Sequence, residues 1–128
     1  MDAYQIQEAA KTWRYLNGYS GDGAGIKGYK VSYQQHKGNL IVKYTTIRME
    51  MDPVTGTELP VVHGYMFTVE LDERLDLYNV VIAEYKQCET LREIRLDGLY
   101  WEDLVAGKLL KSLLGEPINK DIKCECKK

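Results

Sequence analysis

Residues 61–71 constrain the fold more than any other segment of the chain. Apolar or aromatic side chains, with one histidine among them, occupy every second position, and glycine, threonine and acidic residues dominate the positions between them. A period of two places alternate side chains on one face of an extended strand. The segment therefore predicts a strand in a sheet that has one buried and one solvated face.

Two other segments have apolar residues at helical spacing. Residues 3–17 follow Asp2, which is suited to the N-cap, and precede Gly18, which can end a helix in the left-handed conformation. Residues 100–114 carry lysines near their end and are followed by Gly115. This arrangement suits the helix macrodipole, as do the acids expected in the first turn, Glu102 and Asp103. We expect a helix at each of these places.

Residues 29–36 and 40–51 predict a β-hairpin. In its second strand, apolar residues fall on even positions up to Tyr44 and on odd positions from Ile47. Such a change moves apolar groups to the opposite face unless a residue is inserted. We therefore expect a bulge or a bend near Thr45–Thr46.

Residues 77–86 are open to two interpretations, because Val80-Val81-Ile82 favours a strand while the wider pattern also fits a helical stripe. We expect a strand. Turns are predicted at residues 37–39, 52–56 and Asp97-Gly98. Residues 121–127 alternate strictly and predict a final strand.

The length of 128 residues and the 45% apolar composition predict one domain, residues 1–128. We expect an α+β fold with an N-terminal helix, a mainly antiparallel sheet of four to six strands, a C-terminal helix packed on one sheet face and a short C-terminal strand. No apolar run approaches the ~20 residues that cross a bilayer, and no secretory signal is evident. Three cysteines suit a reducing compartment, so we expect a cytoplasmic protein without membrane contact.

The motifs that carry chemistry are weak. Residues 23–28 have the letters of the dinucleotide fingerprint, but a predicted helix precedes them and a strand follows, which reverses the required order. Cys124 and Cys126 form one Cys-x-Cys without the second pair of a closed zinc site. His63 could approach Cys88 as a nucleophile pair, but a hydrogen-bonded structural histidine is the simpler interpretation. We expect no catalytic residues, metal or cofactor, and no enzyme activity.

Charge is sorted along the chain. Residues 9–49 carry seven bases and one acid, whereas residues 50–103 carry thirteen acids and four bases. A fold that keeps this order presents a basic and an acidic surface, which steer partners together. Cross-strand pairing within the monomer is the alternative, because it would cancel the separation in space.

Bases interleaved with aromatic residues give the candidate binding residues. They are Arg14, Tyr15, Tyr19, Lys27, Tyr29, Lys30 and Lys43. The leading hypothesis is a small non-enzymatic interaction protein: an assembly subunit, or an accessory inhibitor, that binds another protein or copies of itself. The second is a nucleic-acid- or nucleotide-binding module that uses the glycine-rich loop 18–28 with its basic neighbours. A small-molecule enzyme is third.

The expected order of elements is similar to that of small ring-forming tail and neck subunits of bacteriophages. This likeness concerns the fold alone and involves no shared motif. It implies an accessory protein of a virus or mobile element that forms an oligomer.

Overall fold

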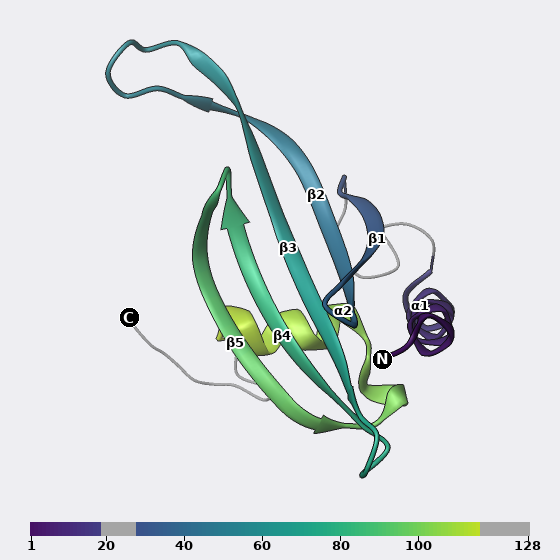
Figure 1. Ribbon diagram of the computed structural model, residues 1–128. Helices are drawn as coiled ribbons and strands as arrows, with labels where there is room; N and C mark the ends of the chain where they lie inside the picture. The colour runs from purple at the N-terminus through teal and green to yellow at the C-terminus, as the bar shows by residue number, and fades with distance from the viewer. Residues whose placement is uncertain (19–27, 116–128) are drawn as a thin grey trace.

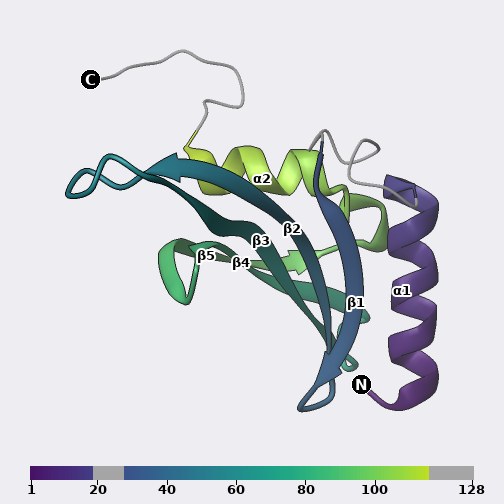
Figure 2. The same ribbon diagram turned by 90° about the horizontal axis from the view of Figure 1, so that it is seen from above.

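The computed structural model describes residues 1–18 and 28–115 and shows an α+β fold (Figure 1). A sheet of five antiparallel strands runs in the order β1-β2-β3-β4-β5, so each strand pairs with its neighbours in sequence. Both α-helices lie on the same side of this sheet (Figure 2). The elements are α1 (Ala3–Asn17), β1 (Lys30–His36), β2 (Asn39–Met51), β3 (Glu58–Asp72), β4 (Leu77–Lys86), β5 (Glu89–Leu99), the short 3₁₀ helix η2 (Trp101–Asp103) and α2 (Ala106–Leu114).

Helix α1 begins as its sequence predicts. Asp2 accepts a hydrogen bond from the Gln5 backbone N–H at 2.8 Å, and the Gln5 side chain accepts one from the Asp2 N–H at 2.9 Å. This reciprocal capping satisfies two backbone donors that the first turn leaves without helical partners. The amino group of Met1 also donates to the Gly38 carbonyl in the β1–β2 turn at 2.7 Å, which ties the start of the chain to the sheet.

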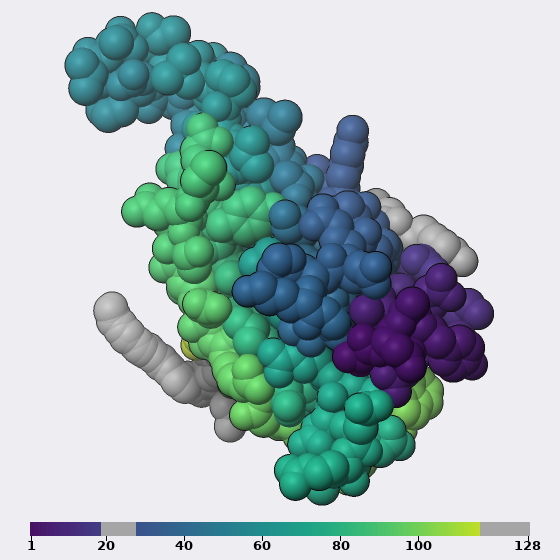
Figure 3. Space-filling model, in the orientation of Figure 1, coloured from purple at the N-terminus to yellow at the C-terminus, as the bar shows by residue number. Residues whose placement is uncertain are grey.

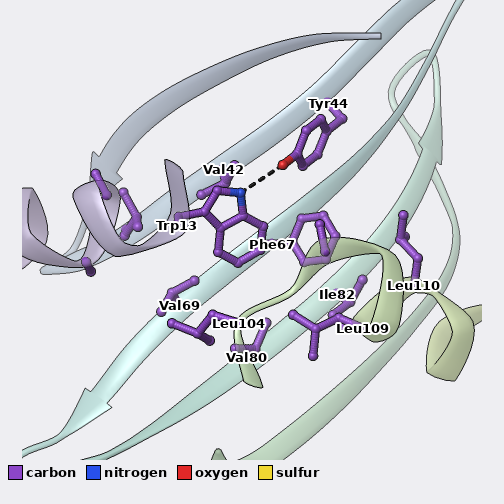
Figure 4. Close-up of a cluster of buried hydrophobic side chains, with 14 of the residues drawn as sticks. Trp13, Val42, Tyr44, Phe67, Val69, Val80, Ile82, Leu104, Leu109 and Leu110 are labelled. Carbon is purple, nitrogen blue, oxygen red and sulfur yellow. Dashed lines mark hydrogen bonds between the residues drawn. The ribbon is translucent and has the colours of Figure 1, made fainter. Parts of the chain in front are cut away.

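The core lies between the helices and the face of the sheet that they cover. Trp13 of α1 is fully buried against Phe67, with ring centroids 4.9 Å apart, and its indole N–H donates to the Tyr44 hydroxyl at 2.8 Å (Figure 4). Burial raises the pKa of Tyr44 to about 12, so this hydroxyl stays neutral. Helix α1 packs on β2, and α2 packs on β4 and β5. Strand parity therefore decides which residues reach the core.

Asn17 joins the two helices from the last position of α1. Its side-chain amide donates to the carbonyls of Trp13 and Leu104, both at 2.9 Å, and its Oδ1 accepts from the Ala106 N–H at 2.7 Å. Only 1% of this residue is exposed. Asn17 thus satisfies a backbone donor at the start of α2, where Val105 has no capping side chain of its own.

The predicted helix 100–114 was wrong at its start. Residues 101–103 form η2, residues 104 and 105 leave helical geometry, and α2 begins only at Ala106. The interruption lets Leu104 point into the core, where it is fully buried, and brings its carbonyl to Asn17. Glu102 and Asp103 consequently belong to η2 and not to the first turn of α2. The end is as predicted, with Gly115 in the left-handed conformation at φ 73°.

The bulge predicted near Thr45–Thr46 is absent from the β2–β3 ladder. Pairing runs from Leu40↔Val69 to Met51↔Glu58 without a shift in register. The change of apolar parity therefore has another cause: Ile47 and the apolar positions after it face away from the core and are exposed. Strand β3 also starts earlier than the predicted residue 61, at Glu58, and includes Pro60.

Residues 77–86 form strand β4, as expected. The turn predicted at Asp97-Gly98 was wrong, because both residues belong to β5. Gly98 adopts φ 72° beside a shift in register between Tyr78 and Val80, and its N–H donates to the Asn79 side chain at 3.0 Å. A glycine in the left-handed region is suited to such a bulge. The β4–β5 connection is formed by Gln87 and Cys88.

Two predicted features lie outside the described residues. They are the final strand at 121–127, with Cys124 and Cys126, and most of the glycine-rich loop 18–28, with Tyr19 and Lys27.

The order of the strands preserves the sorting of charge. Residues 30–51, which form β1 and β2, carry four bases and one acid, and residues 58–99, which form β3 to β5, carry nine acids and four bases. Among the residues that the structure describes, no ion pair joins a base of 9–49 to an acid of 50–103. The pairs Lys86–Glu50, Arg92–Glu84 and Arg95–Glu70 all form within the acidic segment. Cross-strand pairing therefore does not cancel the separation.

Replacing Asn17 with alanine is expected to lower the free energy of unfolding by about 2–4 kcal/mol, because the Leu104 carbonyl and the Ala106 N–H lose their partner in a buried site. Urea denaturation measures this loss. The matched control is Thr12→Ala, which removes a hydrogen bond within α1, from the Thr12 hydroxyl to the Glu8 carbonyl at 3.0 Å. Similar stabilities for the two variants would show that Asn17 does not join the helices.

Candidate functional site

The β2–β3 hairpin extends beyond the rest of the sheet. Pairing with β1 ends at Lys30↔Thr45, and pairing with β4 ends at His63↔Lys86, while β2 and β3 continue to pair as far as Met51↔Glu58. Residues 47–61, here called the arm, therefore form a two-stranded ribbon. In the space-filling view the arm stands clear of the body of the molecule (Figure 3).

One face of the arm is apolar. Ile47, Met49 and Met51 lie on the face of β2 that points away from the helices, and they are 67%, 57% and 65% exposed. Pro60 and Val62 of β3 lie directly opposite Met49 and Ile47, so they share that face. A two-stranded hairpin in water is at best marginally stable, and apolar side chains left exposed on it gain little from burial. Such a surface is typical of one that is covered by a partner.

The tip of the arm is a closed turn with an apolar end. Asp52 and Thr57 bracket it: the Asp52 N–H donates to the Thr57 carbonyl, and the Gly56 N–H donates to the Asp52 carbonyl, both at 2.8 Å. The Asp52 carboxylate also accepts from the Val54 N–H at 2.9 Å. Val54 is 90% exposed. The turn thus presents an aliphatic side chain at the far end of the arm.

On the helix-covered face, the base of the arm is held by a polar cluster. Its centre is His63, which is 5% exposed and lies 2.7 Å from both the Tyr29 hydroxyl, through Nδ1, and the Glu84 carboxylate, through Nε2. Glu84, 7% exposed, accepts a second hydrogen bond from Arg92 Nε at 2.6 Å. In the tautomer with hydrogen on Nε2, this nitrogen donates to the Glu84 carboxylate and Nδ1 accepts from the Tyr29 hydroxyl. The cluster therefore links the segment before β1 to β3, β4 and β5.

The same cluster reaches into the arm. Arg48 donates to the Tyr29 hydroxyl at 2.5 Å and lies over its ring, and Lys86 forms an ion pair with Glu50 at 2.6 Å. These contacts brace the first residues of the arm against the body. Met51 and the turn that follows lie beyond them.

The charges in the cluster shift the pKa values of its members. Burial of the Glu84 carboxyl acts to raise its pKa, but the hydrogen bonds from Arg92 and His63 and the positive charge of Arg92 outweigh this, so the pKa of Glu84 is lowered from 4.5. Burial raises the pKa of Tyr29, with Arg48 opposing the shift. Glu84 is therefore ionised and Tyr29 neutral near pH 7.

The opposite face and the outer edge hold the arm as well. Tyr85 lies across Gly64, and its hydroxyl lies 2.9 Å from the Thr45 hydroxyl. A Cβ at Gly64 would meet the Tyr85 ring and, at 2.7 Å, the Tyr44 carbonyl, so only glycine fits there. At the edge, Gln87 hydrogen-bonds to both the N–H and the carbonyl of Val62.

These contacts tie the base of the arm to the body, and among the described residues they reach no farther along the arm than Glu50. Because the N–H and carbonyl of Val62 point to the outer edge, the nitrogen of Pro60, two residues earlier, points to the same side. The missing N–H of Pro60 therefore costs no hydrogen bond with β2. It also removes a donor from the exposed edge of β3, which discourages pairing of this edge with a strand of another chain.

The structure divides the predicted binding residues between different surfaces. Arg14 lies over the Tyr33 ring, 5.0 Å from its centroid, in a groove of about 490 Å³ between α1 and β1. Tyr15 is 80% exposed on the outer side of α1. Tyr29 belongs to the polar cluster on the helix-covered face.

Lys30 and Lys43 lie instead on the uncovered face of the sheet, where they are close diagonal neighbours on β1 and β2. Of the described members of the predicted set, these two alone share a face. The structure therefore does not gather the described members of the predicted set into one platform for stacking and charge.

Sequence reasoning missed the arm and the polar cluster. The signals for the arm were present in the parity change at Ile47, the exposed turn at residues 52–56 and Pro60, but they were interpreted as a bulge and a delayed strand. His63 was expected to be a hydrogen-bonded structural histidine, and this is confirmed. Its partner Glu84 gave no signal, because contact across strands is set by register and not by spacing along the chain.

Comparison with protein-family models, curated proteins and solved structures finds no match for this chain. Within residues 1–18 and 28–115, no helix has the length and apolarity that crossing a membrane requires. The same residues contain no group of three or more histidine, cysteine or acidic side chains placed to hold a metal ion. The arm and its base are the features from which a function can be argued.

Replacing Arg92 with methionine is expected to lower the free energy of unfolding by about 1–3 kcal/mol at pH 7, because ionised Glu84 loses a charge-assisted hydrogen bond. A carboxyl with a lowered folded pKa stabilises the fold above its ordinary pKa, and this stabilisation is lost as pH falls through the folded value. The difference from the unmodified protein should therefore shrink below pH 4.5.

Urea denaturation at a series of pH values measures this difference. Arg74→Met is the control, since Arg74 is 89% exposed and lies 3.9 Å from Asp72, and it should change stability little at any pH. A cost for Arg92→Met that is the same at pH 7 and pH 3 would contradict the role given to Glu84.

Proposed function

We propose that this protein is a non-enzymatic assembly subunit that associates with copies of itself through the arm. The observation that carries the proposal is an apolar ribbon, Ile47, Met49 and Met51 with Pro60 and Val62, held at its base by hydrogen bonds from three sides and uncovered beyond it. A protein that needed the arm only for its own fold would bury these side chains. Exposed apolar side chains on an arm that is held at its base can instead insert against a neighbouring subunit.

The distribution of charge supports association between unlike surfaces. Bases gather on β1 and β2 at one side of the sheet, and acids prevail on β3 to β5. Identical surfaces of like sign repel, so a two-fold contact between two basic or two acidic sides is disfavoured. A head-to-tail contact brings opposite signs together, and repetition of such a contact gives a closed ring or an open filament.

The triple variant Ile47→Thr, Met49→Thr and Met51→Thr is expected to weaken self-association at least about tenfold, because the apolar face becomes polar while β-propensity is kept. At a concentration where both proteins are monomeric, the thermal midpoint should change little, since these side chains are exposed in the monomer. Multi-angle light scattering against concentration measures the molar mass relative to the monomer of 14.7 kDa.

Tyr4→Gln with Tyr15→Gln is the matched control, since both tyrosines are exposed on α1, at 69% and 80%. This control should associate as the unmodified protein does. The unmodified assembly should also weaken between about 0.1 and 0.5 M salt, because screening shortens the range of charge attraction. An unmodified protein that stays monomeric at every concentration would contradict the proposal and would favour a foreign partner.

A further inference from the structure

A groove between β5 and α2 has the chemistry to receive the tip of the arm. Its volume is about 400 Å³, and Leu96, Leu99 and Leu109 line its apolar part. Lys108 and Lys111 of α2 border it, both exposed, and Asp103 lies 3.7 Å from Lys108. The groove thus combines an aliphatic floor with a rim that has one more positive than negative charge.

The tip of the arm has complementary features. Val54 is the most exposed large apolar side chain of the described residues, at 90%. Asp52 and Glu58 flank it at the two ends of the turn, and the segment from Glu50 to Glu58 contains three acids and no base. An aliphatic side chain flanked by two carboxylates matches a leucine-lined groove that two lysines of α2 border.

We propose that the tip of the arm of one copy, centred on Val54, docks in the β5–α2 groove of the next copy. This inference rests on the proposed function and names the two surfaces that meet. Each chain carries one tip and one groove, on different parts of its surface, so each copy gives one contact and receives another. The contact joins two unlike surfaces, an acidic tip and a lysine-bordered groove, so its repetition from copy to copy gives a ring or a filament.

The lysines of α2 make this groove suitable for an acidic tip, although its other wall is formed by β5. Residues 58–99 carry an excess of acids, which would repel Asp52 and Glu58. Lys108 and Lys111 interrupt that acidic surface at the groove. Apolar contact then supplies most of the affinity, and the lysines select the docking position.

Charge exchange between separate chains tests the inference. The tip variant is Asp52→Asn with Glu58→Lys, in which asparagine keeps the side-chain acceptor for the Val54 N–H. The groove variant is Lys108→Gln with Lys111→Glu. Sedimentation velocity measures the association of each variant alone, of the two mixed at equal concentration, and of the chain carrying all four substitutions. Arg74→Glu, in the exposed β3–β4 turn, is the control for a change of net charge alone.

Each variant alone should associate at least about tenfold more weakly than the unmodified protein, because like charges then meet at the contact. The mixture and the fourfold variant should regain association to within about threefold, since every tip again meets a groove of opposite sign. Circular dichroism and the thermal midpoint confirm that each variant is folded. Lys111→Gln removes the cation at the end of α2 without adding an anion, so its thermal midpoint shows how much stability that cation contributes.

Three results would overturn the inference, and they differ in what else they affect. If the unmodified protein does not self-associate, the proposed function fails as well. If it associates, and the arm triple variant weakens it but the groove variant does not, the assembly stands and the docking site lies elsewhere. If both charge variants weaken association but the mixture does not restore it, the tip and the groove do not meet each other.

Discussion

The unequal length of neighbouring strands produces the arm and the polar cluster at its base. β2 and β3 have 13 and 15 residues, whereas β1 has 7 and β4 has 10. A sheet can bury a strand only as far as its neighbours and covering helices extend. The two long central strands therefore have to leave the body together, and the residues beyond their neighbours must either be stabilised by a partner or remain exposed.

Along the helix-covered face of β3, from the body of the molecule toward the arm, the side chains change from buried apolar to polar and then to exposed. Val69 and Phe67 are buried under the helices, His63 lies among polar partners at the edge of the core, and Leu59 is exposed in the arm. The polar cluster marks the transition. His63 and Glu84 can be buried there because the Tyr29 hydroxyl and the Arg92 guanidinium satisfy their hydrogen-bonding groups. The cluster thus fixes the direction in which the arm leaves the body.

Local patterns were sufficient to predict most elements of the fold. Asp2 and Gly18 marked the limits of α1, and strict alternation marked the strand that contains Phe67. The errors came from contacts distant in sequence. Asn17 interrupts the predicted helix 100–114 by holding Leu104 and Ala106, and the bulge at Gly98 depends on pairing with β4, so neither leaves a local signal.

The candidate site was less accessible to sequence reasoning. Ile47 is apolar at a position that alternation assigns to the solvated face. In a strand with neighbours on both sides, such a residue indicates a bulge, whereas in a strand that extends beyond its neighbours it can simply be exposed. Only the lengths of the neighbouring strands distinguish these cases, and those lengths follow from the complete topology. The described members of the predicted basic and aromatic set do not form one surface for a related reason: alternation sends Tyr29 and Lys30, adjacent in sequence, to opposite faces.

The central claim is that the arm is covered by a neighbouring copy. Hydrogen–deuterium exchange at low and high protein concentration tests it most directly, because backbone amides of a two-stranded ribbon exchange readily unless they are covered. We predict that amides of residues 47–61 become protected as concentration rises, while those of the β3–β4 turn at residues 73–76 do not change. Exchange of the arm that is independent of concentration, in a protein that nevertheless forms oligomers, would contradict the account.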